Sequence, residues 1–463
     1  MSKKVLSYRL VERILARVLN NMTAKKILSK TGQQKNTNFA TNFRHMLTGN
    51  VLAQVVGVLT IPILAKLYDP EAFGILGAFS VALGLIVALF TLKFEWCIPN
   101  TKTMKSAFNL FAISLVSLLS GTFIFSVLIY FGLASYMFSL LFGSSIDVAM
   151  LQKMELWLVP GMLCFGLINC LKSLFVKSNF LKPVSKATVL QHLTRAITGI
   201  ALGLYSANYH NLVLANVVAY FIGAVAMISA LRFKSASFRI TSLSRLSVLF
   251  RHHFSTAFVS SLTSLVNVVS ASLVLILVIR NYSVVEGGWY SFIMSISAGP
   301  LLLITSALGQ AYWGHSSKLV SNRDYAELNS HFMTITFRLL CLGIPVVLLC
   351  SLGPLLIPAL LGEEKWGSAG LLLPCMIPLL VGMLAFSPTN HLIVIGRQHY
   401  QLILDGLKIF LILMSFEICF VLNLSVYVAV FLSSLASLAT YILLFVIHIR
   451  RHKELQQADI KGQ

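Results

Sequence analysis

The chain has 463 residues, with 36 Lys and Arg against 15 Asp and Glu, so its formal net charge is +21. It is 57% hydrophobic and only 11% charged, whereas soluble domains carry roughly 25% charged residues. This composition excludes a soluble globular protein and predicts a polytopic membrane protein. In such a chain a basic excess reflects orientation in the membrane, and nucleic acid is not expected as a partner.

The N-terminal segment, residues 1–43, is basic and precedes the first apolar run. Leu6, Leu10, Ile14 and Val18 fall on one helical stripe, and arginines fall on another face. This pattern is typical of an amphipathic helix lying on anionic membrane lipid. A basic tail without structure, which only helps to set orientation, explains the same residues equally well. The segment also lacks the apolar core and cleavage site of a signal peptide.

The remaining chain predicts about twelve transmembrane helices, since a span needs roughly 20 apolar residues. The predicted spans are 46–65, 72–92, 107–132, 156–176, 186–206, 211–231, 254–279, 288–313, 332–352, 370–395, 401–422 and 425–448.

Basic residues are distributed unevenly between the two sides that these spans define. The tail and the even-numbered loops carry most of them, and the opposite side carries only Lys66, Lys153, Arg280 and Lys365. By the positive-inside rule both termini are expected in the cytoplasm. The protein is thus predicted to be all-α, with a six-helix bundle over 44–231, a basic cytoplasmic linker over 232–253, a second six-helix bundle over 254–448 and a cytoplasmic tail over 449–463.

Two stretches that open spans are similar. "LYDPEAFGILGAFSVALG" (67–84) begins the second span and "SVVEGGWYSFIMSISAG" (283–299) begins the eighth. Aligning Gly74 with Gly288 gives an offset of 214 residues. The twelve spans therefore divide into two sets of six in the same orientation, which is a parallel repeat, and transporter sites often lie between such halves.

The stretch 61–99, "IPILAKLYDPEAFGILGAFSVALGLIVALFTLKFEWCIP", resembles the opening of the Wzx-type polysaccharide-biosynthesis flippases. These transport O-antigen or exopolysaccharide units and belong to the multidrug/oligosaccharidyl-lipid/polysaccharide exporter superfamily. The matching residues are Pro62, Leu67, Tyr68, Pro70, Phe73, Gly74, Phe94, Glu95, Ile98 and Pro99.

The resemblance implies two six-helix bundles around a central cavity. It also implies a cargo, an oligosaccharide repeat unit linked to undecaprenyl pyrophosphate, that moves to the outer leaflet of the bacterial inner membrane. A polysaccharide polymerase and a chain-length regulator are the implied protein partners. No cofactor is implied, and the coupling ion would be a proton or sodium.

Two cations lie inside predicted spans at equivalent depths. Arg195 is in the fifth span and Lys408 in the eleventh, 213 residues apart, within one residue of the repeat offset. Cations there complement a pyrophosphate, and arginine offers a two-pronged donor where lysine offers a point charge. We expect both to line one cavity and bind the anionic head group, because intramembrane charges are by default functional.

Structural explanations of the same cations stay open. Asp405 lies three residues before Lys408 and would neutralise it in an intrahelical ion pair. Arg195 would instead bond His192 or backbone carbonyls, or extend toward the cytoplasm.

Three acids are candidates for ion coupling or gating: Asp405, Glu417 and Glu95. A buried carboxyl group can bind a coupling proton, although Glu417 is explained as well by a hydrogen bond to a neighbouring helix. Glu95, next to the second span, is either a gate residue at the cytoplasmic mouth or the partner of Lys93.

Asn50 and Gln54 in the first span and Asn267 in the seventh are candidates for contacting sugar hydroxyls, although hydrogen bonds between helices are the more common role. Two further function classes remain: a multidrug or small-solute exporter of the same superfamily, and a membrane-embedded polymerase or glycosyltransferase. The second is disfavoured because the outward loops carry only scattered acids, with no clustered catalytic or metal site.

Overall fold

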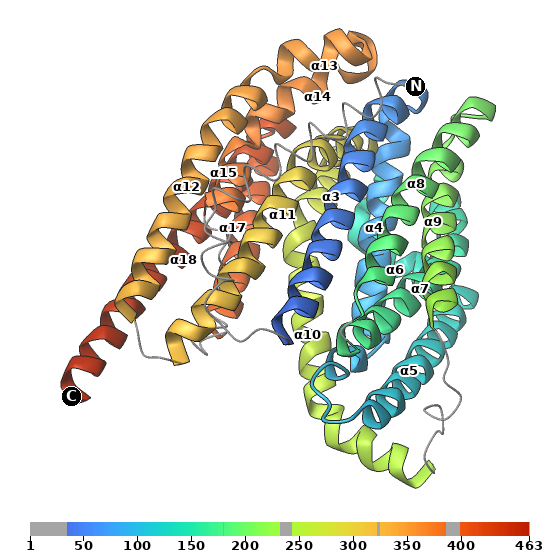
Figure 1. Cartoon of the computed structure of the whole chain (residues 1–463). Helices are drawn as coiled ribbons and strands as arrows, with labels where there is room; N and C mark the ends of the chain where they lie inside the picture. The colour runs from blue at the N-terminus through green and yellow to red at the C-terminus, as the bar shows by residue number, and fades with distance from the viewer. Residues whose placement is uncertain (1–34, 179, 232–242, 322–324, 386–398, 463) are drawn as a thin grey trace, which may run out of the picture.

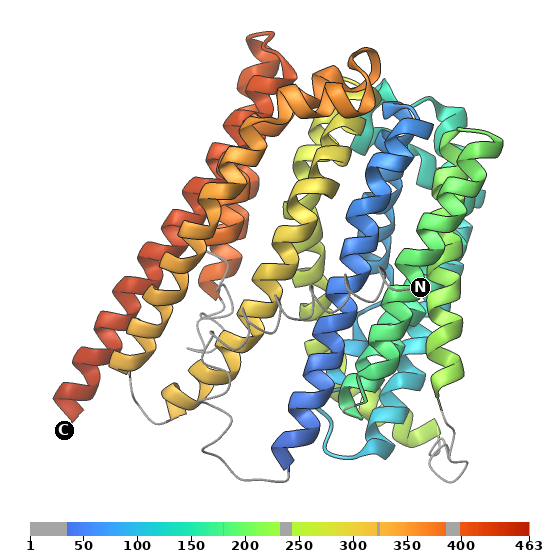
Figure 2. The same ribbon diagram turned by 45° about the horizontal axis from the view of Figure 1, so that its top comes forward.

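The computed structural model describes residues 35–178, 180–231, 243–321, 325–385 and 399–462, and within these ranges the secondary structure is entirely helical. Figure 1 shows one bundle of long helices, with short helices at the end where α13 and α14 lie. This end is called the α14 end below. The start of α3 and the finish of α18 both lie at the opposite end (Figures 1 and 2).

The N-terminal half contains six long helices and three short segments. In chain order they are α3 (Lys35–Leu67), α4 (Pro70–Phe90), η1 (Phe94–Cys97), α5 (Met104–Tyr130), α6 (Leu133–Phe142), η2 (Gly143–Ser145), α7 (Val148–Lys177), α8 (Lys182–Tyr205) and α9 (Tyr209–Ala230).

The C-terminal half repeats this order with one span broken into short helices. Its elements are α10 (Leu243–Asn281), α11 (Val284–Ser321), α12 (Tyr325–Ser351), α13 (Gly353–Leu361), α14 (Glu363–Cys375), α15 (Ile377–Ala385), α17 (His399–Val421) and α18 (Val426–Gly462).

Each predicted span coincides with a described helix or, for 370–395, with the bent pair α14–α15 as far as Ala385. Eight described helices are long and apolar enough to cross a membrane, or nine if the bent pair, with its 49° angle, forms one span. Helix α8 is not among them, because Gln191, His192 and Arg195 interrupt its apolar sequence. The prediction of an all-α polytopic membrane protein is confirmed.

Some predicted boundaries meet continuous helix. The second part of the linker, from Leu243, already belongs to α10, and α18 continues through the predicted C-terminal tail to Gly462. Residues 1–34 of the tail and 232–242 of the linker lie outside the described residues, as does the end of the tenth span.

The two halves meet where α4 crosses α11, and the repeat is visible in this contact. A Cβ on Gly74 would overlap the carbonyl oxygen of Val284, and one on Gly288 would overlap that of Pro70. Because 70 + 214 = 284 and 74 + 214 = 288, these two contacts are equivalent. Each glycine's Cβ would also lie 3.1 Å from the other's amide nitrogen. The predicted offset of 214 is therefore the register of a self-complementary contact, in which residue i meets j and the equivalent of j meets the equivalent of i.

Candidate functional site

Arg195 lies half-buried on α8 and faces α9. Its guanidinium carbon is 5.7 Å from the centre of the Tyr220 ring on α9, within the range of a cation–π contact. Its Nε is buried and has no hydrogen-bond partner. The predicted alternatives for this side chain, a bond to His192 or to a carbonyl, do not satisfy that nitrogen. Arg195 therefore holds a buried donor that is ready for an acceptor.

Polar side chains surround Arg195 between α3, α8 and α9. The Nδ1 of His192 lies 3.2 Å from the place of a Cβ on Gly57 of α3, and the Gln191 side chain packs on Gly223 of α9. Asn216 on α9 is 4% exposed, and its Oδ1 has no partner. Glycine at both facing positions gives these large side chains their room. The interior of the N-terminal half is thus polar at this level.

The C-terminal half has a counterpart on equivalent helices. The Nζ of Lys408 on α17 is also 5.7 Å from a tyrosine ring, that of Tyr441 on α18. Asp405 is half-buried on the same helix. Among the described side chains, no ion pair within 4.0 Å joins Asp405 to Lys408. The predicted intrahelical pair is therefore not formed in this structure.

The two cation–tyrosine contacts share their cation positions but not their tyrosine positions. The cations differ by 213 residues, whereas Tyr220 and Tyr441 differ by 221, seven more than the repeat offset. Seven residues are about two helical turns, roughly 10 Å along the axis. Helices α8 and α17 lie on opposite sides of α3 and α11 in both views (Figures 1 and 2). The structure thus gives each half its own site and does not bring the two cations into contact.

The other predicted contact residues are placed differently. Gln54 on α3 reaches α11, with its Nε2 2.7 Å from the place of a Cβ on Gly299. It therefore packs across the seam between the halves, in agreement with a role between helices. Asn50 is half-buried, and Asn267 is exposed on α10. Glu417 is exposed near the end of α17, so the hydrogen bond predicted for it to a neighbouring helix is not present.

Glu95 lies in η1, beyond the end of α4, and is 3% exposed. Its carboxylate is 3.5 Å from the Nζ of Lys93, so the predicted local ion pair is formed. Burial raises the pKa of the Glu95 carboxyl, and the positive charge of Lys93 opposes this shift. Leu92 and Lys93 both have positive φ, 48° and 44°, a conformation that is uncommon for residues other than glycine.

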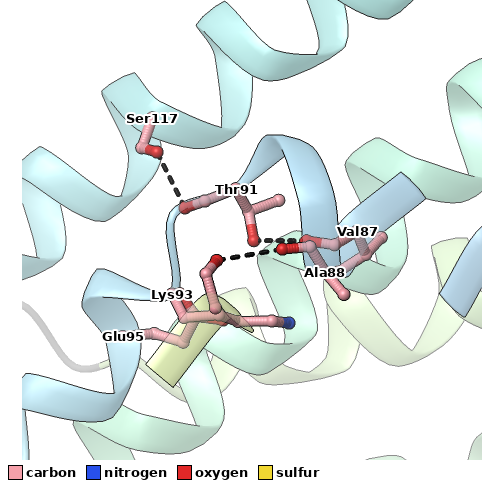
Figure 3. A network of polar contacts seen from close by, with 7 residues as sticks. Val87, Ala88, Thr91, Lys93, Glu95 and Ser117 are labelled. Carbon is pink, nitrogen blue, oxygen red and sulfur yellow. Dashed lines mark hydrogen bonds and ion pairs between the residues drawn. The ribbon is translucent and has the colours of Figure 1, made fainter. Parts of the chain in front are cut away.

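Hydrogen bonds hold the chain around this turn (Figure 3). Ser117 of α5 donates to the carbonyl oxygen of Thr91 at 2.7 Å, and Ser261 of α10 donates to that of Ala88 at 2.9 Å. Phe94 packs on Phe250 of α10, with ring centres 5.1 Å apart. The turn that carries Glu95 is thereby fixed to both halves at the end of the bundle opposite α14.

At the α14 end, α14 is docked onto the N-terminal half. The Trp366 side chain is fully buried, and its indole nitrogen donates to the carbonyl oxygen of Ala65 on α3 at 2.8 Å. Its ring meets Phe73 and Phe292 edge-on or tilted, at 5.4 and 4.5 Å. Lys365 pairs with Asp69 at 2.7 Å, with both side chains more than half exposed. These contacts close the seam at the α14 end.

Sequence reasoning missed the partners in these contacts. Tyr220 and Tyr441 are ordinary aromatic residues in apolar runs, and nothing in their spacing singles them out. Asp69 and Lys365 were recognised only as scattered loop charges on the same side. That shared side was the one available signal, and it does not specify a pair.

Two six-helix halves that meet along α4 and α11, with intramembrane cations in equivalent helices, define a membrane transporter. The arrangement is similar to an inward-facing MATE-family multidrug resistance transporter of the MOP superfamily (TM-score 0.68, 14% identity, 92% of this chain and 99% of that one). It is also similar to the lipid II flippase MurJ in an inward closed conformation (TM-score 0.65, 13% identity, 88% and 89% of the two chains). A third similar structure is a MOP superfamily transporter from Pyrococcus furiosus (TM-score 0.61, 14% identity, 92% and 100%).

The chain belongs to the polysaccharide biosynthesis protein family, whose sequence model matches residues 63–369. No curated protein matches it. The predicted resemblance to polysaccharide-biosynthesis flippases of the MOP superfamily is confirmed by the family together with the fold. The same two findings confirm a transporter in place of a membrane enzyme.

Proposed function

We propose that this protein is a flippase for an oligosaccharide repeat unit linked to undecaprenyl pyrophosphate, in O-antigen or exopolysaccharide assembly. Cargo would move from the cytoplasmic to the outer leaflet of the bacterial inner membrane. The observation that carries the proposal is the pair of intramembrane cations, Arg195 and Lys408, each held over a tyrosine ring on equivalent helices. Family membership supports a polysaccharide precursor as cargo.

The chemistry of the cations fits a phosphorylated head group. An isolated ion in hydrocarbon costs tens of kcal/mol on Born estimates, so a pyrophosphate needs a polar path with positive charge. Arg195 supplies a buried donor without a partner, beside the amide of Asn216. Organic cations, the typical cargo of drug exporters, would be repelled by the same charge. A lipid-linked anion is therefore favoured over a cationic drug.

The conformation supports alternating access from the cytoplasmic side. The halves are closed at the α14 end by Trp366 and by the Asp69–Lys365 pair, and α12 and α18 slope away from the N-terminal half toward the opposite end (Figure 2). The chain overlays better on the inward-facing MATE transporter than on an outward-facing one, with TM-scores of 0.68 and 0.55. With both termini cytoplasmic, as the basic loops predict, the structure is inward-facing.

Reconstitution tests the function directly. Vesicles containing the purified protein and a lipid-linked oligosaccharide are treated from outside with a glycosidase, and the protected fraction is measured over time. The proposal expects the protein to expose cargo that stays protected in protein-free vesicles. The double variant Arg195→Ala, Lys408→Ala, reconstituted at the same density, should not expose it. Equal exposure by the double variant would contradict the cationic site, and organic-cation transport without exposure of the lipid would favour the drug exporter.

Topology is tested separately by cysteine labelling from outside whole cells. Cysteines placed at Ser145 and Glu363 should react, and those placed at Ile240 and Val320 should not. Labelling at Ile240 would reverse the orientation and, with it, the inward-facing assignment.

A further inference from the structure

Glu155 is a buried acid that the proposed transport path does not use. It lies on α7, about two turns from the helix start at the α14 end, and only 2% of its surface is exposed. Its Oε1 is buried and has no hydrogen-bond partner. The hydroxyl of Ser135 on α6 interacts with the carboxyl group. Within the part of the chain that the structure describes, no cation lies within 4.0 Å of it.

A carboxylate ion in this position would lack compensation. Burying a charge is costly unless it is paired and hydrogen-bonded. A hydroxyl on one side and an empty acceptor position on the other supply neither. The neutral acid, by contrast, is tolerated among its apolar neighbours Leu151, Met154 and Leu158.

No other titratable group at this place can neutralise Glu155. The charged or titratable groups on the elements that pack here are exposed or half-buried and form no ion pair with it. They are Lys153 and Asp147 on or beside α7, Tyr136 on α6, Tyr130 on α5, Arg280 on α10, Glu71 on α4, and Tyr209 and His210 on α9.

The short helix α6 connects this acid to the seam between the halves. α6 packs on α7, which carries Glu155, and also on α10 of the C-terminal half. The η2 segment that follows continues the contact: Gly143 packs against Arg280, and the Ser145 hydroxyl donates to the Arg280 carbonyl oxygen at 3.5 Å. Water reaches Glu155 only if the elements that cover it move, and moving α6 loosens its contact with α10.

We propose that Glu155 is a proton-binding site, neutral in the conformation seen here, whose ionisation is linked to opening of the seam at the α14 end. Because the closed arrangement holds the acid without a charge partner, it binds the proton more tightly than an arrangement in which α6 has lifted. By linkage, a proton at Glu155 favours closure, and loss of that proton favours opening. This inference extends the proposed transport cycle by naming a coupling ion and its residue, and only that extension rests on the proposed function.

The protonation state is measured on the purified wild-type protein without cargo. Dicyclohexylcarbodiimide, which reacts with the protonated form of a carboxyl group, is applied from about pH 5 to about pH 9, the range into which burial can move a carboxyl group. Mass spectrometry of peptides then locates the adduct. We expect Glu155 to be modified at the acidic end and progressively less as pH rises, and exposed Glu364 to serve as the unmodified reference. Absence of the Glu155 adduct at every pH would overturn the proposal.

The link to the seam is measured by hydrogen exchange of residues 133–145, corrected for the intrinsic pH dependence of exchange. Wild-type protein should lose protection in this segment several-fold as pH rises. Glu155→Gln, which imitates the neutral acid, should stay protected, and Asp147→Asn, an exposed acid at the start of the same helix, should behave as wild type. If Glu155→Gln shows the wild-type pH dependence, the acid is not the switch. Because neither experiment uses the lipid-linked cargo, they succeed or fail independently of the proposed function.

Discussion

The cation site of the N-terminal half and that of the C-terminal half share a position in the fold and differ in chemistry. Arg195 has an unpartnered buried Nε and neutral polar neighbours, whereas Lys408 has an acid, Asp405, one turn away. Each cation faces a tyrosine at 5.7 Å, but the two tyrosines lie two turns apart in the repeat. The repeat has therefore preserved where the positive charge stands and not what surrounds it. This difference suggests that Arg195 binds the head group and that Lys408 has the weaker role.

The largest effect is expected at Arg195. Arg195→Ala removes a charged donor, and hydrogen bonds to charged groups contribute about 1.5–3 kcal/mol, so export should fall roughly ten- to hundredfold. Arg195→Lys should keep part of the activity, because the charge remains while the two-pronged geometry is lost. Export is measured as surface polysaccharide in a deletion strain, with membrane protein quantified alongside.

Lys186→Ala is the matched control for Arg195, since Lys186 is an exposed cation on the same helix α8. Its export should equal that of the wild type. Normal export by Arg195→Ala would remove the N-terminal site from the mechanism and leave Arg195 with a structural role.

A smaller effect is expected at Lys408. Lys408→Ala should reduce export several-fold, because a point charge near an acid binds an anion less strongly than a free guanidinium does. The same strain assay distinguishes a binding role from a structural one through the double variant Asp405→Ala, Lys408→Ala. If Lys408 binds cargo, the double variant stays as impaired as Lys408→Ala. Recovery of export would show that the two residues act as a structural pair, despite the absence of a contact within 4.0 Å.

The sequence predicted the positions of these sites better than their surroundings. Hydropathy located the spans, and the Gly74–Gly288 alignment gave the register that the structure shows as a reciprocal contact. The same register related Arg195 to Lys408. The tyrosine partners could not be predicted, because they depend on how α9 and α18 rotate about their axes. Burial of Glu155 depends likewise on α6, a short helix in what hydropathy shows only as a loop between spans.

The aromatic partners should contribute less than the cations. A cation–π contact is worth about 0.5–2 kcal/mol, so Tyr220→Leu should reduce export by about two- to thirtyfold, while Tyr220→Phe keeps the ring and should behave as wild type. Tyr441→Leu should have a weaker effect, in line with the smaller role of Lys408. The quantity to compare is the ratio of the Leu to the Phe variant at each site. Equal losses in the Phe and Leu variants would assign the effect to the hydroxyl group.

The smallest effect is expected at the Asp69–Lys365 pair, even though it joins the two halves at 2.7 Å. Both side chains are more than half exposed, and exposed ion pairs contribute about 0–1 kcal/mol. The buried Trp366 contacts remain when the pair is removed, so Asp69→Asn should leave the seam closed and export nearly unchanged. Trp366→Ala should open the seam far more, because it removes a fully buried ring and a hydrogen bond to Ala65. Labelling of a cysteine placed at Phe73, a ring neighbour of Trp366, measures both. If Asp69→Asn exposes that cysteine as strongly as Trp366→Ala, closure is electrostatic, and it should then weaken as salt concentration rises.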